Sequence, residues 1–182
     1  MLQPQRLREQ TISAKVQWEL KLRTLLNPST KVALVGVGHP LRGDDYVGSM
    51  IAKRIIEATD GELPEHVYLF DAQDDVENLI SELSRLDLRH VVFIDACEMG
   101  GKAGEINLLS VAETSYPFFT THGIPLKVLA EHLLNESEVW VLAIQPKCTE
   151  FDGGLSPELR DAATYVSNFI VLSLTEGVGE VV

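Results

Sequence analysis

Hydrophobic residues recur along the chain with two spacings, which predict strands that alternate with helices. Unbroken apolar stretches and short alternating ones predict five strands, at residues 32–38, 66–70, 91–94, 105–109 and 139–144. Apolar residues three or four positions apart predict four helices after the first strand, at residues 46–59, 76–86, 125–134 and 156–174. This alternation favours the α/β class.

The predicted fold is a three-layer αβα sandwich around a mostly parallel, mixed and twisted sheet of about five strands. The strand at 105–109 follows the strand at 91–94 too closely for a helical crossover, so we expect it to be antiparallel. In such sheets, ligands bind beyond the carboxyl ends of the strands. Polar residues at those ends are therefore the candidates for chemistry.

The first 30 residues are predicted to form a helical extension before the α/β domain of residues 31–182. A helix is expected over 5–27, because apolar side chains recur at helical spacing, at Ile12, Val16, Leu20, Leu22, Leu25 and Leu26. It should end at Asn27, since Pro28 disfavours the helical conformation of the residue before it. We expect an accessory helix packed on the domain, with a partner-binding arm as the alternative.

Composition narrows the functional classes. The net charge of −12 repels phosphate backbones, which argues against a nucleic-acid partner. No apolar stretch is long enough to cross a bilayer, and no export signal is apparent, so no membrane partner is expected. Two cysteines fit a reducing compartment. A cytoplasmic monomer is the resulting expectation.

The loop of residues 36–48, GVGHPLRGDDYVG, joins the first strand to its helix. A dinucleotide site is rejected, because Leu41 replaces the third glycine of that fingerprint and the acidic pair Asp44 and Asp45 would repel a pyrophosphate. One aspartate of the pair is expected to cap the helix. The other is then free to face the strand ends.

Asp95 and Asp71 follow two further strands, and His122 precedes the helix predicted at 125–134. Asp71 is expected to satisfy loop amides. Asp45, Asp95 and His122 would meet at one edge of the sheet, and two carboxylates with one imidazole suit Zn²⁺ or Ni²⁺ with positions left open for water or substrate. The sequence therefore predicts a metal-binding, peptidase-type site.

Five motifs carry a resemblance to a known family: residues 36–48, then VVFIDA at 91–96, GEI at 104–106, TTHGIPL at 120–126 and AIQP at 143–146. In this order they resemble the [NiFe]-hydrogenase maturation endopeptidases of the formate-hydrogenlyase type. The resemblance implies removal of a short C-terminal tail from the large-subunit precursor once nickel is inserted. It also implies that Asp45, Asp95 and His122 are the metal ligands and catalytic residues.

Three positions depart from the family pattern: His39 stands for Asn, Tyr46 for Gly, and Lys147 for an acidic residue. His39 and Tyr46 would alter the fit of the substrate tail, and His39 would offer a further ligand. Supporting or substrate-contacting roles are expected for four residues, Asp44, Asp71, His39 and Thr121.

Two versions of the chemistry remain open. The three ligands hold a resident ion such as zinc, or they bind nickel carried by the precursor, which the resemblance favours. A cysteine peptidase using Cys97, His122 and Asp95 is disfavoured, because nearby acidic groups would raise the pKa of the thiol. A non-catalytic nickel-binding or hydrogenase-chaperone module would keep the three ligands without cleavage.

Overall fold

Five strands form one mixed sheet in the order β2-β1-β3-β5-β4 in the computed structural model, which describes residues 17–113, 137–149 and 154–176. The strands are β1 (Val32–Val37), β2 (Val67–Gln73), β3 (His90–Ala96), β4 (Ile106–Ser110) and β5 (Glu138–Ile144). The first four in spatial order run parallel, and β4 is antiparallel to β5. The predicted mixed sheet is therefore confirmed, including the antiparallel strand.

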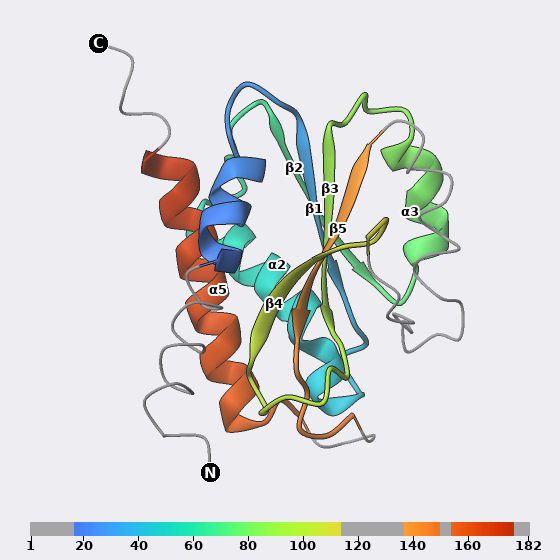
Figure 1. Cartoon of the computed structure of the whole chain (residues 1–182), viewed down its shortest axis with the longest axis vertical. Helices are drawn as coiled ribbons and strands as arrows, with labels where there is room; N and C mark the ends of the chain where they lie inside the picture. The colour runs from blue at the N-terminus through green and yellow to red at the C-terminus, as the bar shows by residue number, and fades with distance from the viewer. Residues whose placement is uncertain (1–16, 114–136, 150–153, 177–182) are drawn as a thin grey trace.

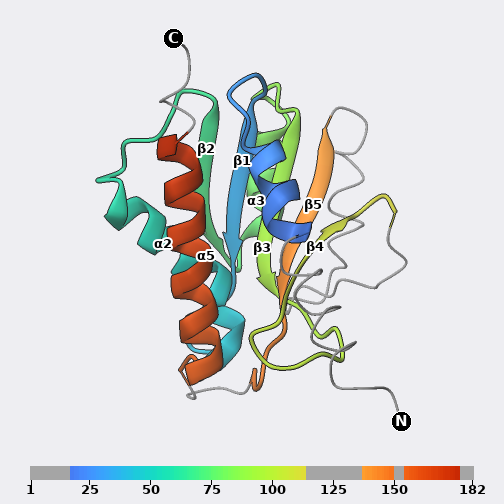
Figure 2. The same ribbon diagram turned by 60° about the vertical axis from the view of Figure 1, so that its left-hand side comes forward.

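Helices cover both faces of this sheet (Figures 1 and 2). The helices are η1 (Gly43–Tyr46, a short 3₁₀ helix), α2 (Val47–Ala58), α3 (Val76–Leu83) and α5 (Pro157–Glu176), and residues 17–25 are also helical. On one face lie α2, α5 and the helix of residues 17–25, and on the other lies α3 (Figure 1). This arrangement confirms the three-layer αβα sandwich.

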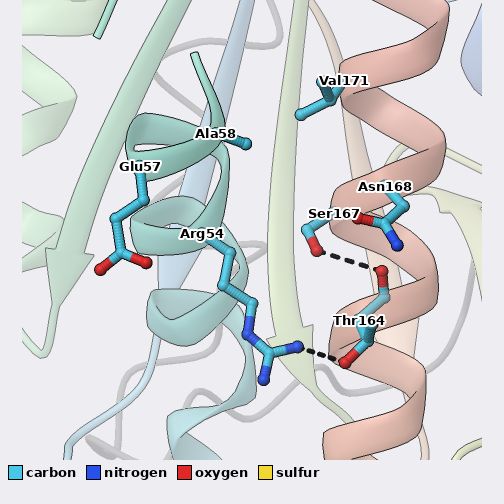
Figure 3. Close-up of a pocket in the computed structure, with 7 residues that line it drawn as sticks. All are labelled: Arg54, Glu57, Ala58, Thr164, Ser167, Asn168 and Val171. Carbon is cyan, nitrogen blue, oxygen red and sulfur yellow. Dashed lines mark hydrogen bonds between the residues drawn. The ribbon is translucent and has the colours of Figure 1, made fainter. Parts of the chain in front are cut away.

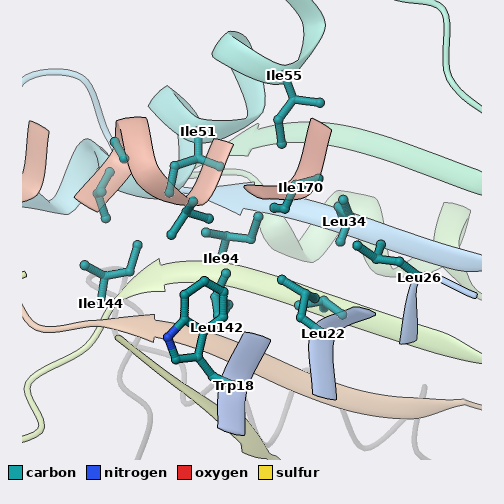
Figure 4. Packing of buried hydrophobic residues seen from close by; sticks show 14 of the residues in the cluster. Trp18, Leu22, Leu26, Leu34, Ile51, Ile55, Ile94, Leu142, Ile144 and Ile170 are labelled. Atoms are coloured by element: carbon teal, nitrogen blue, oxygen red, sulfur yellow. The ribbon is translucent and has the colours of Figure 1, made fainter. Parts of the chain in front are cut away.

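Each face of the sheet has its own hydrophobic core, and strand alternation assigns every side chain to one of them. Leu34, Ile94 and Leu142 lie on the face covered by α2 and α5, where they share one core with Ile51 and Ile170 (Figure 4). The residues between them on the strands point toward α3; they include Val35, Phe93 and Val141. Position along a strand therefore decides which layer a polar side chain meets.

The helix of residues 17–25 packs on the α2–α5 face, which confirms that part of the predicted accessory helix. Trp18 and Leu22 are buried in the core and Trp18 contacts the ring of Phe169 edge-on. Leu20, expected on the apolar side, is 61% exposed, so that assignment is wrong. The buried face starts at Trp18 and continues one and two turns later, whereas Leu20 lies half a turn away. The domain boundary at residue 30 stays a prediction.

Element boundaries differ from expectation in ways that affect the site. β2 continues to Gln73, so Asp71 lies within the strand rather than at its end. Ile56, expected on the apolar side of its helix, is 41% exposed, and that assignment is also wrong. The helix predicted at 125–134 lies outside the described residues. Within the described part of the chain, no helix is long and apolar enough to span a membrane.

Candidate active site

Close backbone contacts at two glycines seat η1 on the carboxyl ends of β1 and β3. A Cβ atom on Gly38, whose φ is +127°, would lie 1.7 Å from the carbonyl oxygen of Asp45. A Cβ on Gly48 would lie 1.9 Å from the carbonyl oxygen of Ile94. Only glycine permits both approaches. As a result, the backbone of Asp45 lies against the end of β1, and the start of α2 lies against β3 one residue before Asp95.

Asp45 is fully buried on η1. Its Oδ2 accepts a hydrogen bond from the backbone N–H of His39 at 3.2 Å, and its Oδ1 has no hydrogen-bond partner among the described residues. The ring of His39 is engaged elsewhere: Nδ1 accepts from the N–H of Leu41 at 3.1 Å, and Nε2 lies 4.0 Å from Asp74 Oδ2. Thus the backbone of His39, rather than its ring, supports Asp45.

Asp95 is the second buried carboxylate, 2% exposed near the end of β3. It lies on the α3 face, because it alternates in step with Phe93. Burial, and then the negative charge of Asp45, raise the pKa of Asp95 well above its usual value. Its Oδ1 also lacks a partner within the described ranges. The two carboxylates are therefore close enough to repel each other out of contact with water.

This pair suits a cation. Two buried carboxylates, each with an unpaired oxygen, are unfavourable until a positive charge or a proton compensates them. Carboxylate oxygens are also ligands for divalent ions. The third predicted ligand, His122, and the neighbouring Thr121 lie outside the described residues. The residues that are described contain no group of three His, Cys, Asp or Glu side chains placed to hold an ion.

Asp44 has the opposite environment from its neighbour, with every oxygen occupied. Its carboxylate accepts hydrogen bonds from the N–H of Lys147 at 2.8 Å and of Cys148 at 3.0 Å. It also accepts from the N–H and the hydroxyl of Ser156, at 2.6 and 3.0 Å. Neither η1 nor α2 has a side-chain cap, so the expectation that one aspartate of the pair caps the helix is wrong. Instead, Asp44 ties η1 to the segment that starts α5.

Asp71 faces away from this pair. It shares the α2 side of β2 with Val67 and Leu69, whereas Asp95 faces α3. Its Oδ2 lies 3.5 Å from Lys53 Nζ, which in turn donates to the Tyr46 hydroxyl at 2.8 Å. The sheet thus separates Asp71 from Asp95. The expectation that Asp71 satisfies loop amides is not met by any hydrogen bond among the described residues, where its Oδ1 has no partner.

Cys97 lies beside the carboxylate pair but is poorly suited to be a nucleophile. It is buried, and that burial, followed by the charges of Asp95 and Asp45, raises the pKa of the thiol well above its usual value. This raised pKa of the Cys97 thiol agrees with the expectation from the sequence. A thiol held in this protonated form argues against the cysteine-peptidase alternative.

Gln145 is a buried polar residue whose importance sequence reasoning missed. It is 3% exposed, directly after β5, and its side chain makes four hydrogen bonds. The available signal was a polar residue that follows a buried strand in the AIQP motif. That motif was used only for the resemblance.

Comparison with known proteins agrees with this architecture. Together with the fold, it defines a protease of the hydrogenase maturation class. The sequence model of HycI, described as a hydrogenase maturation protease, matches residues 53–172, more than half of the 182 residues. The chain therefore belongs to the HycI family of hydrogenase maturation proteases. The hydrogenase 3 maturation protease of Escherichia coli K12 is 30% identical over 135 residues, which cover 73% of this chain and 84% of that protein.

Solved structures show the same fold. The [NiFe] hydrogenase maturation protease HycI of Thermococcus kodakarensis superposes with a TM-score of 0.75 at 24% identity, covering 85% of this chain and 98% of that one. The endopeptidase HycI of Escherichia coli has a TM-score of 0.66 at 27% identity, covering 76% and 87%. The family match begins at residue 53, so it includes Asp95 but not Asp45. The role of Asp45 consequently depends on the motif and the geometry.

Proposed function

We propose that the protein is an endopeptidase that removes the C-terminal tail of a [NiFe]-hydrogenase large-subunit precursor after nickel insertion. In this proposal, Asp45, Asp95 and His122 recognise the nickel that the precursor carries. Membership of the maturation-protease family supports the class of reaction. The observation that carries the proposal is the buried pair Asp45 and Asp95, each with one oxygen unpaired among the described residues.

A raised pKa on Asp95 explains how such a pair could respond to a cation. Without a cation, Asp95 retains a proton more readily than an ordinary aspartic acid, which relieves the repulsion from Asp45. Binding of a divalent ion favours the ionised carboxylate, and the proton leaves. The unpaired oxygens of the two residues are then the ligands. A site of this kind suits substrate-borne nickel, and zinc or another resident ion is the alternative.

The same carboxylates can serve hydrolysis. Either Asp45 or Asp95 can accept a proton from the water that attacks the scissile carbonyl carbon. The new C–O bond then forms, the C–N bond breaks, and the proton passes to the leaving amine. A bound divalent ion would polarise the carbonyl.

Cleavage of a nickel-loaded precursor tests the proposal directly. Incubation with the protein should shorten the precursor on a denaturing gel, and nickel-free or zinc-loaded precursor should stay intact. Asp45→Asn, Asp95→Asn and His122→Ala should each abolish the shortening. Glu57→Gln is the control, because Glu57 lines the hollow between α2 and α5, a site that contains neither carboxylate (Figure 3).

The outcomes separate the alternatives. Precursor binding without shortening would favour the non-catalytic module. Shortening that persists in Asp45→Asn and Asp95→Asn would contradict the assigned site. Cleavage of zinc-loaded or metal-free precursor would contradict the recognition of nickel while leaving the protease assignment intact. A cytoplasmic monomer remains our prediction for the state in which the protein acts.

A further inference from the structure

Gln145 lies beside the loop that leaves β3 after Asp95. On the sheet, Ala143 of β5 pairs with Asp95, and Gln145 follows Ala143 by two residues on the same side. The N–H of Cys97 donates to the carbonyl of Ile144 at 3.0 Å, which continues the pairing past the end of β3. The side chain of Gln145 therefore starts next to the loop of residues 97–105, here called the β3–β4 loop.

The side chain of Gln145 is directed mainly at that loop. Its Oε1 accepts hydrogen bonds from the N–H of Met99 at 2.7 Å and of Gly101 at 3.2 Å. Its Nε2 donates to Glu98 Oε1 at 2.7 Å and to the carbonyl of Pro146 at 3.1 Å. Three of these four bonds end in the β3–β4 loop. A single buried amide thus fixes three residues of a loop that has no regular secondary structure.

Few hydrogen bonds other than those of Gln145 hold the β3–β4 loop in place among the described residues. Gly100 and Gly104 adopt φ values of +73° and +80°, so its backbone turns through conformations that glycine permits easily. Its far end is held by two backbone bonds, from Gly104 N–H to the Gln145 carbonyl at 2.9 Å and from Gln145 N–H to the Glu105 carbonyl at 2.8 Å. Between these ends, Lys102 N–H donates to Glu105 Oε2 at 3.1 Å, and Asn107 Nδ2 donates to Met99 Sδ at 3.6 Å. The side chain of Gln145 ties Glu98, Met99 and Gly101 to the end of β5.

We infer that Gln145 is a positioning residue for the proposed cleavage, and this inference rests on the proposed function. By holding Met99 and Gly101, it keeps the β3–β4 loop at a fixed distance from the carboxylate pair at the end of β3. The loop begins two residues after Asp95, so we expect a peptide bound at Asp95 to lie beside it. A small displacement of the loop would misalign the scissile bond without removing any group that reacts.

Replacement of Gln145 by alanine is the first test. The kcat for shortening nickel-loaded precursor should fall about 10- to 100-fold, whereas KM should change by less than about threefold. Exchange of the Met99 and Gly101 amides with deuterium, measured without substrate, should become faster. Ser137→Ala is the matched control: it removes a 2.7 Å bond from Ser137 Oγ to the Leu88 carbonyl at the opposite end of β5 and should leave kcat unchanged.

Exchanging the two side-chain partners separates positioning from general stability. Glu98→Gln combined with Gln145→Glu reverses the donor and the acceptor across the contact between these two side chains. The carboxylate at position 145 can still accept from Met99 and Gly101, and it loses the bond that Gln145 Nε2 donates to the Pro146 carbonyl. The double variant should recover part of the kcat that Gln145→Ala loses, because the bonds to Met99 and Gly101 return. A folded Gln145→Ala protein with kcat within about twofold of wild type would overturn the inference. So would a folded double variant whose kcat stays as low as that of Gln145→Ala.

A failure of the proposed cleavage can be distinguished from a failure of the positioning role of Gln145. If the wild-type protein does not shorten the precursor, the proposed cleavage is wrong whatever Gln145 does. The amide exchange rates of Met99 and Gly101 then decide alone whether Gln145 holds the loop. Unchanged exchange in Gln145→Ala would overturn the positioning role even where wild-type cleavage is normal.

Discussion

The carboxylate of Asp44 connects η1 to two segments that lie more than 100 residues later in the chain, so its removal should be costly. It accepts two bonds from the segment after β5, at Lys147 and Cys148, and two from Ser156 at the start of α5. Asp44→Ala deletes all four and leaves the donors facing a small void. The helix η1, which carries Asp45, then loses its side-chain bonds to both segments and keeps the backbone bond from the N–H of residue 44 to the Cys148 carbonyl at 3.0 Å.

The size of the loss follows from the environment of each donor. A hydrogen bond to a charged group contributes about 1.5 kcal/mol at the low end of its range, so four such bonds contribute about 6 kcal/mol if nothing replaces them. Lys147 and Cys148 are exposed residues, and water can replace the carboxylate at their amides. The two bonds to Ser156 are less easily replaced. We therefore expect Asp44→Ala to lower the free energy of unfolding by about 3 kcal/mol.

Urea unfolding followed by circular dichroism measures this loss. For a slope of about 2 kcal/mol per molar urea, the midpoint should fall by roughly 1 to 2 M. Asp161→Ala on the exposed side of α5 is the control and should change the free energy by less than about 0.5 kcal/mol. A loss below about 1 kcal/mol in Asp44→Ala would refute the reasoning, because water would then satisfy every donor as well as the carboxylate does.

Three further predictions concern the buried carboxylate, the thiols and the close glycine contact. Because the pKa of Asp95 is raised in the folded state, that state binds more protons than the unfolded state, and the contribution of Asp95 to stability falls as pH rises through the folded-state pKa. Asp95→Asn should remove this fall and be more stable than wild type near neutral pH. Urea midpoints of the variant that follow those of wild type from about pH 4 to about pH 8 would contradict this. Iodoacetamide should label exposed Cys148 at least about tenfold faster than buried Cys97 in a time course followed by peptide mass spectrometry. The Cys97→Ala variant should still shorten the precursor. Equal labelling rates, or loss of cleavage in Cys97→Ala, would restore the Cys97 thiol as a candidate nucleophile. Gly48→Ala forces a Cβ to within 1.9 Å of the Ile94 carbonyl oxygen and should cost about 3 kcal/mol or more, so a melting temperature within about 2 °C of wild type would show that the helix can shift without penalty.

Much of the fold could be predicted from the sequence because it depends on local pattern. Strand β3 has apolar side chains on both of its faces, and such a strand must be buried on both sides of the sheet. Helix faces were harder to predict. The expected stripe through Leu20 missed Trp18, because two overlapping helical spacings fit the same short segment and only the tertiary contacts choose between them.

The site was only partly predictable for a related reason. The carboxyl-end rule correctly indicated that Asp45 and Asp95 could lie at one edge of the sheet, but it applied equally to Asp71. The extra length of β2 and the alternation of its side chains place Asp71 on the other face. Long-range hydrogen bonds escaped prediction altogether: the partners of Asp44 lie 103 to 112 residues away and have no local signature.

The contrast between Asp44 and Asp45 shows what the structure adds to a sequence motif. Both side chains are buried, and both follow Gly43 in the same short helix. Four donors surround the first carboxylate, whereas one backbone amide supports the second and one of its oxygens has no partner in the described ranges. A protein that depended on both residues only for stability would gain by supplying donors to both. The unpaired oxygen of Asp45, close to a second buried carboxylate, is the feature that the proposed ligand role would require and that stability alone does not.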